Sequence, residues 1–218
     1  FCTRLTSPPT SNTRSRPSRL AVAACGVLVL LGLGLRSPPL DAALAGRDQG
    51  TYMLRAAAAA KDGALWRTNP ALAAAGQALD ERPGPADIVG LYPVDRRPSR
   101  EGVYEGAYRP GFYLADRSEG LVVPQFLHLF PALLGMTRWS LPGALTPAIN
   151  LFISALWLLT SFCVGLRVFR RELPALAWTA TLCLDPLAIW VGRHPLTEPL
   201  DALLWMTALL CLLRKPSD

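Results

Sequence analysis

A chain of 218 residues in which 51% are hydrophobic and 17% charged, with a positive mean hydropathy, is unusually apolar for a soluble domain of that size. Its mean hydropathy is +0.27, and its apolar residues are gathered into separate runs, which is typical of a polytopic membrane protein. The net charge of +6 could suggest a nucleic-acid partner. The basic residues lie where they would orient membrane spans, however, so we expect no nucleic acid among the partners.

Four runs are apolar enough to be considered as membrane spans. The first, over residues 20–35, is continuous, whereas the third, over 175–191, is interrupted by Asp185 and Pro186. A fifth run, over 121–136, contains two prolines, and a span exposed to lipid would leave the backbone groups freed by proline unsatisfied. We therefore interpret that run as interfacial or re-entrant. The predicted spans are 20–35, 147–169, 175–191 and 200–213.

Charge bias orients these spans. The tail over 1–19 has four arginines and no acidic residue, so we expect it in the cytoplasm. The first span then exports a loop that is nearly neutral, with 12 Lys/Arg against 11 Asp/Glu over 36–142, and the next span returns Arg170 and Arg171 to the cytoplasm. The predicted organisation begins with a basic cytoplasmic tail (1–19) and a first span (20–35). An outer loop with surface helices (36–146), three further spans (147–213) and a cytoplasmic end (214–218) follow.

Two features of the chain leave alternatives open. The first span could be a signal peptide, because basic residues precede it. The segment that follows begins Arg36-Ser37-Pro38 and lacks a small-residue cleavage pattern, although residues 42–45 come near one, so we interpret the span as an uncleaved anchor. The sequence begins with Phe, and its last apolar run stops close to the C-terminus. We therefore expect a fragment of a protein with further spans.

The exported loop begins with a predicted helix over 49–61 that lies along the membrane surface. The stretch is rich in alanine, Asp48 is placed to cap its N-terminus, and Gly63 is placed to end it. The stretch over 69–117 is dense in proline, glycine and arginine, so we expect an irregular loop there. No pair of Cys or His residues in the sequence has zinc spacing, and no phosphate-binding glycine loop of the standard kinds is present.

Three short segments, in a consistent order, resemble the GT-C glycosyltransferases. They are DQGTY at 48–52, PQFLHLFPALLG at 124–135 and WVGRHPLTEP at 190–199. The pattern is similar to the dolichyl-phosphate-mannose–protein mannosyltransferases and to the bacterial aminoarabinose transferase, and it covers roughly residues 20–213. Many members carry Asp-Glu where this chain has Asp48-Gln49. That difference weakens any role that needs two carboxylates there, but it spares a single general base.

The resemblance implies an all-α polytopic membrane fold and a glycosyltransferase that takes its sugar from a polyprenyl-phosphate donor. An acceptor hydroxyl must lose a proton as it attacks the anomeric carbon, and a carboxylate at the membrane surface can accept that proton. Asp48 is the candidate general base, and Glu198 is a second catalytic candidate that orients the acceptor or holds a metal. The partners implied are the lipid donor and membrane lipid. No cofactor is certain, and a divalent metal is left open.

The remaining candidates bind the two substrates. The departing lipid phosphate accumulates negative charge that an arginine would stabilise. The candidates for the donor phosphate are Arg47, Arg55 and Arg193. The candidates for the acceptor are Tyr52, His128 and His194. The resemblance implies an integral protein of a bacterial-type plasma membrane with its active site on the non-cytoplasmic side.

Each candidate also has a purely structural interpretation. Asp48 could serve only as a helix cap, and Glu198 could do the same for the fourth span, where the helix dipole favours a negative charge. His128 could be a packing or interfacial residue. Asp185 lies within a span, where an ionisable group is a functional hypothesis by default, but the adjacent Pro186 favours a kink or a helix contact.

The alternative function is a polytopic transport or assembly protein without catalysis. Asp185 and the proline-broken segments would suit a transporter, in which discontinuous helices form a site near the membrane midplane. Asp48 and Glu198 are both predicted to lie outside the bilayer core. Their position favours the transferase.

Overall fold

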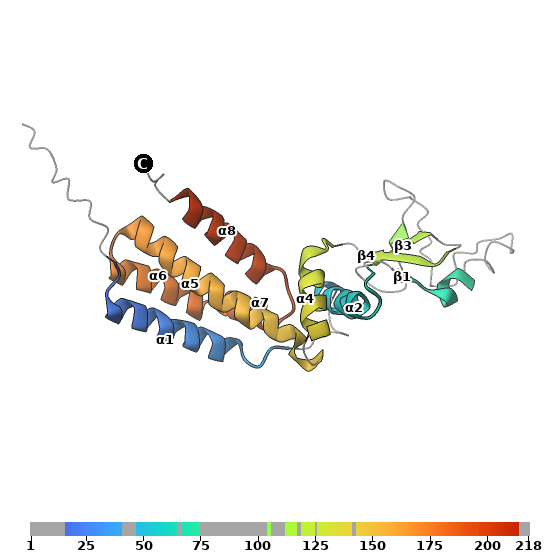
Figure 1. Cartoon of the computed structure of the whole chain (residues 1–218), viewed down its shortest axis with the longest axis horizontal. Coiled ribbons are helices and arrows are strands. Elements are labelled where there is room, and N and C mark those ends of the chain that lie inside the picture. Colours follow the sequence, from blue (N-terminus) through green and yellow to red (C-terminus); the bar gives the residue numbers. More distant parts are fainter. Residues whose placement is uncertain are drawn as a thin grey trace, which may run out of the picture.

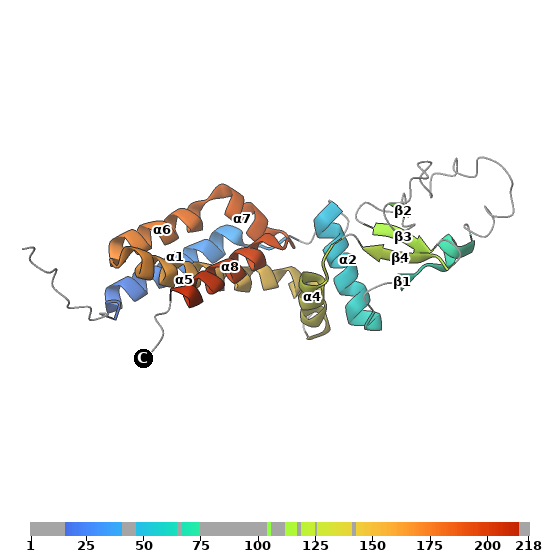
Figure 2. The same ribbon diagram turned by 90° about the horizontal axis from the view of Figure 1, so that it is seen from above.

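The computed structural model of the chain describes residues 16–40, 47–64, 67–74, 104–105, 112–116, 119–124, 126–140 and 143–213. The first 15 residues of the expected cytoplasmic tail, most of the expected loop over 69–117 and the end over 214–218 lie outside the described residues. Three parts follow one another along the molecule. They are a helical bundle, a pair of helices across one end of it, and a small sheet (Figure 1, Figure 2).

The bundle consists of α1 (Arg19–Arg36), α5 (Ile149–Phe169), α6 (Glu172–Leu184), α7 (Pro186–Arg193) and α8 (Glu198–Leu212). The predicted helices over 20–35 and 147–169 are confirmed as α1 and α5. Ser18 caps α1, because its hydroxyl accepts a hydrogen bond from the Ala21 amide at 3.1 Å. The same hydroxyl donates to Glu172 at 2.7 Å, which ties the start of α1 to the start of α6.

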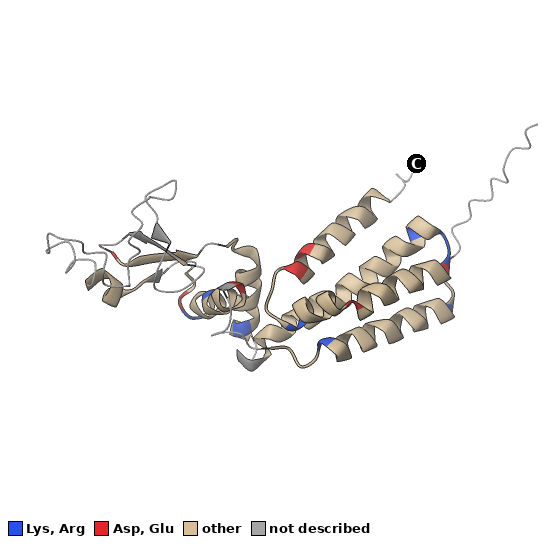
Figure 3. Ribbon diagram, turned by 180° about the vertical axis from the view of Figure 1, so that it is seen from behind, with Lys and Arg blue, Asp and Glu red and all other residues tan. Residues whose placement is uncertain are grey.

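The two ends of the bundle differ in what they carry. Arg19, Arg170 and Arg171 lie where α1 begins and where α5 gives way to α6, and we call this the arginine end. The loop end is the opposite one, where α1 and α7 finish and α5 and α8 begin. Figure 3 shows charged residues mainly near these ends, with long uncharged stretches of helix between them. This distribution is the one that the positive-inside rule predicts for spans with a cytoplasmic arginine end.

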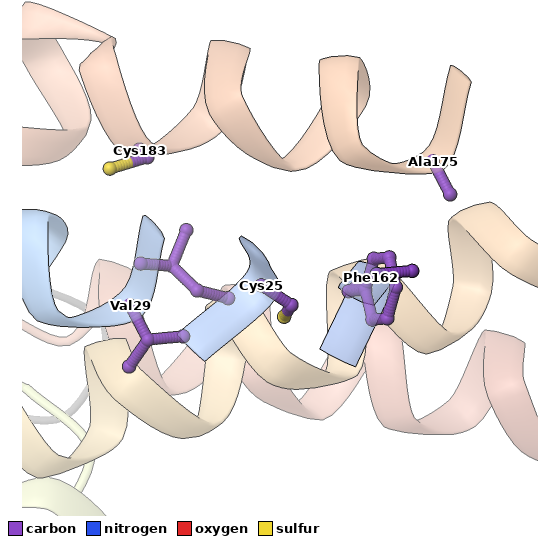
Figure 4. Packing of buried hydrophobic residues seen from close by; sticks show 7 residues of the cluster. Cys25, Val29, Phe162, Ala175 and Cys183 are labelled. Carbon is purple, nitrogen blue, oxygen red and sulfur yellow. The ribbon is translucent and has the colours of Figure 1, made fainter. Parts of the chain in front are cut away.

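Small and apolar side chains fill the space between α1, α5 and α6. Figure 4 shows Cys25 and Val29 from α1 facing Phe162 from α5 and Cys183 from α6. Helices α5 and α6 approach closely where Gly165 meets Ala175, since a Cβ on Gly165 would lie 3.1 Å from the Ala175 Cα. Close approach at small residues is the usual way in which membrane helices pack. Helix α1 thus contributes to this core, and its role as an uncleaved anchor stays a prediction.

The third predicted span is broken at Asp185. The carboxylate of Asp185 caps α7, because it accepts hydrogen bonds from the amides of Leu187 at 2.8 Å and Ala188 at 3.4 Å. Helices α6 and α7 meet at a bend of 57°. Pro186 is the first residue of α7, where a missing N–H is tolerated. Asp185 thus has the role that the kink interpretation assigns to it.

Arg36 of α1 is fully buried and stabilises the break between α6 and α7. The guanidinium of Arg36, at the end of α1, donates to the carbonyls of Leu182 and Cys183, each at 3.3 Å. These carbonyls lie at the end of α6, where helix geometry leaves them without intrahelical partners. Gly192 of α7 leaves room for the Arg36 side chain, because a Cβ there would lie 2.8 Å from its Cδ.

Among the described residues, two helices are long and apolar enough to cross a membrane, or three if the bent pair α6–α7 counts as one span. The two are Arg19–Arg36 and Leu145–Phe169. The predicted fourth span corresponds to α8, whose 15 residues are about 22 Å long against a hydrocarbon core of about 30 Å. A membrane protein is thus supported, whereas the count of four spans stays a prediction.

Two helices lie across the loop end of the bundle, α2 (Arg47–Asp62) and α4 (Leu129–Ser140), with a 3-10 helix η2 (Gly143–Ala148) leading into α5. The helix predicted over 49–61 is confirmed and begins two residues earlier. Asp48 therefore lies within its first turn, and the expected position of Asp48 before the helix is wrong. Gly63, with φ of 65°, ends α2 as expected. The alanines of α2 allow close contact, since a Cβ on Gly135 of α4 would lie 3.2 Å from the Ala59 Cβ.

A small antiparallel sheet follows this pair and departs from the expected all-α fold. Its strands are β1 (Arg67–Thr68), β2 (Tyr104–Glu105), β3 (Phe112–Asp116) and β4 (Leu121–Pro124), in the order β1-β4-β3-β2. The expectation of an irregular loop over 69–117 is wrong for β2 and β3. The pairing of Arg67 with Val122 joins segments that are far apart in sequence, so no local pattern indicates it. The fold remains mostly helical.

Candidate functional site

Tyr52 is the centre of the candidate site. It lies on α2 and is 6% exposed. Its ring packs against Phe126, in the segment that leads into α4, and against Phe130, in the first turn of α4. The centroid distance is 5.4 Å to Phe126 and 5.5 Å, edge-on, to Phe130. Its hydroxyl is hydrogen-bonded to the side chain of Thr197, just before α8. One tyrosine therefore joins α2 and α4 to the loop end of the bundle.

The two catalytic candidates both influence this tyrosine electrostatically. Asp48 lies one turn before Tyr52 on α2 and is half-buried, while Glu198 is the first residue of α8 and is exposed. Both carboxylates interact electrostatically with the Tyr52 hydroxyl. Two residues far apart in the sequence thus act electrostatically on the same group. Their catalytic roles stay a prediction.

The environment of Tyr52 keeps its hydroxyl protonated. Burial raises the pKa of Tyr52, and although the hydrogen bond with Thr197 lowers that pKa, the charges of Asp48 and Glu198 raise it further. A neutral phenol is a hydrogen-bond donor as well as an acceptor. It could therefore help to orient an incoming hydroxyl near the two acidic residues.

Arg55 and His128 form a second contact between α2 and the start of α4. Arg55 is 4% exposed, and its Nη1 lies 2.6 Å from Nδ1 of His128. Burial lowers the pKa of Arg55, and burial together with the charge of Arg55 lowers the pKa of His128. Of the three arginines expected to bind the donor phosphate, Arg55 is thus engaged with a residue that the sequence assigns to the acceptor.

The remaining candidates lie on the segment that links α7 to α8. Arg193 is the last residue of α7, and its carbonyl accepts a hydrogen bond from the Leu40 amide at 2.7 Å. His194 stacks on Trp190, with ring centroids 4.5 Å apart, and its Nδ1 donates to the Trp190 carbonyl at 2.8 Å. These contacts give Arg193 and His194 a place at the loop end of the bundle. The side chain of Arg47 lies outside the described residues.

Sequence reasoning missed two residues that hold the site together. One is Thr197, whose only sequence signal is its place beside Glu198. The other is Asn150 of α5, which is fully buried and whose amide nitrogen donates to the carbonyls of His194 at 2.5 Å and Leu196 at 3.1 Å. A lone asparagine in an apolar run is the available signal, since polar groups inside membrane helices usually have a partner. Asn150 fixes the segment that delivers Thr197 and Glu198.

In the part of the chain that the structure describes, no group of three or more His, Cys, Asp or Glu side chains could hold a metal ion. The open question of a divalent metal thus receives no support from a cluster of ligands there. Comparison of the chain with protein-family models, curated proteins and solved structures finds no match. The site must therefore be interpreted from its own residues.

Proposed function

We propose that the protein is a membrane glycosyltransferase that moves a sugar from a polyprenyl-phosphate donor to an acceptor hydroxyl on the non-cytoplasmic side. The observation that carries this proposal is the electrostatic interaction of both Asp48 and Glu198 with Tyr52 at the loop end of the bundle. The arginine end lies opposite, and basic residues favour the cytoplasmic side. With that orientation the two carboxylates face the non-cytoplasmic surface, where a lipid-linked sugar would present its anomeric carbon.

In the proposed reaction, Asp48 accepts the proton of the acceptor hydroxyl as its oxygen attacks the anomeric carbon. A bond forms between that oxygen and the anomeric carbon, and the bond from the anomeric carbon to the phosphate oxygen breaks. The electron pair leaves with the polyprenyl phosphate, whose added charge needs a cation or a hydrogen-bond donor nearby. Asp48 suits the base role because it is half-buried in the first turn of α2 and still accessible.

Tyr52 and Glu198 are proposed to hold the acceptor. The Tyr52 hydroxyl is held in place by the aromatic rings around it and by Thr197, so it can point a hydrogen bond without losing much freedom on binding. Glu198 is exposed at the start of α8 and can accept a second hydroxyl of the acceptor. Together they would place one acceptor hydroxyl beside Asp48.

The main alternative is a transport or assembly protein without catalysis. The break between α6 and α7 favours it, because discontinuous helices often form transport sites. The carboxylate at that break is already engaged, however, since Asp185 accepts hydrogen bonds from two amides of α7. A transport site there would have to compete with this cap. The electrostatic interaction of Asp48 and Glu198 with one tyrosine at the loop end suits a reaction site at the membrane surface, so we favour the transferase.

The proposal is tested by incubating membranes that contain the full-length protein with a radiolabelled polyprenyl-phosphate sugar and measuring release of polyprenyl phosphate. Glu198→Gln and Tyr52→Phe should slow the release, while Asp201→Asn is the matched control, because Asp201 is an exposed acid in the same first turn of α8. If the wild type releases no polyprenyl phosphate but accumulates the lipid-linked sugar across a vesicle membrane, the transferase is wrong and the transport alternative is right.

A further inference from the structure

One face of helix α4 carries a row of large, exposed apolar side chains. Leu129 and Met136 are seven residues apart and Trp139 follows Met136 by three, so the three side chains lie on one side of the helix. All three are exposed, Met136 by 66% and Trp139 by 80%. Single exposed apolar residues need no explanation, but a row of them along one helix marks an interaction surface.

The opposite face of α4 packs on α2. It carries Phe130, Leu134 and Gly135, which are buried, and a Cβ on Gly135 would lie 3.2 Å from the Ala59 Cβ of α2. Along the molecule the order is bundle, α4, α2 and sheet (Figure 1, Figure 2). The exposed face of α4 is turned away from α2, and it is therefore turned toward the side on which the bundle lies.

The bundle determines what surrounds α4 on that side. Its helices include those that are long and apolar enough to cross a membrane, and α4 lies across their loop end. A helix in this position runs along the membrane surface, and its bundle-facing side meets lipid. Exposed apolar side chains also continue into the next span, with Leu145 in η2 and Phe152 in the first turn of α5. The exposed face of α4 is thus continuous with the surface that α5 presents to lipid.

The charged residues of the helix pair lie away from this face. Arg138 is exposed and lies about 200° around α4 from Met136, because a helix turns by about 100° per residue. Among the described residues of α2, the exposed ones are Lys61 and Asp62. Tryptophan, for its part, is enriched at the level of the lipid headgroups. An apolar face with tryptophan on one side and charged residues on the other is typical of a helix that lies in the membrane interface.

We propose that α4 is an interfacial helix whose exposed face, formed by Leu129, Met136 and Trp139, lies among the headgroups and upper acyl chains of phospholipids at the loop end. Helix α2, which the sequence predicts at the membrane surface, then lies one layer further from the lipid. A second copy of the chain is a poorer occupant of this face. Three side chains are far fewer than the roughly 20–30 residues that each partner contributes to a specific protein interface.

Contact of α4 with lipid sets the distance of the candidate site from the bilayer. Leu129 is exposed on the lipid side of the first turn of α4, and the next residue, Phe130, packs against the ring of Tyr52. The helix that meets lipid therefore also holds the tyrosine at a fixed height above it. The inference concerns contact with lipid, and it does not depend on the sugar transfer proposed above.

The first test measures the depth of Trp139. The 218-residue chain is placed in vesicles of phosphatidylcholine that carries bromine, a fluorescence quencher, either near the headgroups or near the ends of the acyl chains. The fluorescence that is lost in Trp139→Phe is the signal of Trp139, and bromine near the headgroups should quench it more than bromine near the chain ends. No quenching by either lipid, or stronger quenching by bromine near the chain ends, would overturn the proposal.

Trp205 is the matched control for this measurement. It is 70% exposed in the middle of α8, and the signal lost in Trp205→Phe should be quenched more by bromine near the chain ends. The opposite order for the two tryptophans is thus the expected result. The same order for both would contradict the interfacial depth of α4.

The second test compares two neighbouring positions of α4. In a background without other cysteines, Met136→Cys and Arg138→Cys are spin-labelled in phosphatidylcholine vesicles, and collisions with oxygen, which concentrates in lipid, and with a water-soluble nickel chelate are measured. The label at 136 should collide mainly with oxygen and the label at 138 mainly with nickel. If both labels collide mainly with nickel, the face of α4 lies in water. If the label at 136 is immobilised and shielded from both, protein covers that face. Either result would overturn the proposal.

Discussion

A single methyl group added at Gly32 should show whether α1 packs in the bundle as described. A Cβ at this position would lie 2.7 Å from Cδ1 of Leu158 and 3.3 Å from both Arg36 Nη1 and Cys183 Sγ. Leu158 is fully buried, so it has little room to move away. Overpacking of this kind typically costs about 1–3 kcal/mol. The added Cβ also crowds Arg36, whose guanidinium donates hydrogen bonds to the end of α6.

Two other glycines of the same helix provide matched controls. A Cβ at Gly26 or at Gly34 would meet nothing within 4 Å. Alanine is favoured over glycine in a helix interior by about 1 kcal/mol, and this gain applies to all three positions. The difference between Gly32→Ala and either control therefore isolates the packing, and it should be about 1–3 kcal/mol.

The assay is reversible unfolding of the 218-residue chain in mixed micelles as the fraction of denaturing detergent is raised. Leu158→Val removes the atom that the new methyl group meets, so the double variant Gly32→Ala/Leu158→Val should be more stable than the sum of the two single changes predicts. Equal stabilities for the three alanine variants would refute the packing of α1 against α5 and α6. The bundle arrangement that positions the candidate site would then be wrong as well.

The remaining predictions concern the break, the pH response and the topology. Arg36→Met should destabilise the bundle by about 3 kcal/mol, because it leaves buried carbonyls of α6 unsatisfied, while Arg170→Met at the exposed arginine end should have little effect in the same unfolding assay. The pKa of His128 in the folded chain lies below the ordinary histidine value of about 6.5. As the pH falls through about 6.5, the unfolded chain therefore binds more protons than the folded chain, and the free energy of unfolding should decrease. Unfolding of His128→Gln should lack this decrease, and an unchanged pH profile in the variant would contradict it. In a background without other cysteines, Glu119→Cys should react with an impermeant thiol reagent on intact cells, and Arg171→Cys should react only after permeabilisation; the opposite labelling would invert the topology.

The bundle helices can be predicted from the sequence because their signals are local. The apolar runs of α1 and α5 end at arginines, and the adjacent Asp185 and Pro186 indicate a capped bend within the third apolar run. The alanine-rich helix α2 is predictable for the same reason. In each case a pattern within a few turns decides the structure.

The sheet and the assembly of the site depend on contacts between distant residues. β1 and β2 have two residues each, too few to show any alternation of apolar and polar side chains. The hydrogen bond between Tyr52 and Thr197 joins two segments that nothing in the sequence pairs. Asp48 and Glu198 can be chosen as candidates from the motif order, but their shared electrostatic interaction with Tyr52 emerges only from the fold.

The central claim is that Asp48 acts as a general base, and Asp48→Asn tests it most directly. Asparagine keeps the size of the side chain and its hydrogen-bonding ability near a helix start, but it cannot accept the proton. The measurement is release of polyprenyl phosphate from a labelled polyprenyl-phosphate sugar by the full-length protein, with Asp62→Asn at the other end of α2 as control. The rate should fall by about 10²–10⁴ in Asp48→Asn, at wild-type abundance in the membrane, and should be retained in Asp62→Asn. A near-normal rate in Asp48→Asn would leave Asp48 with a structural role alone and would contradict the proposed chemistry.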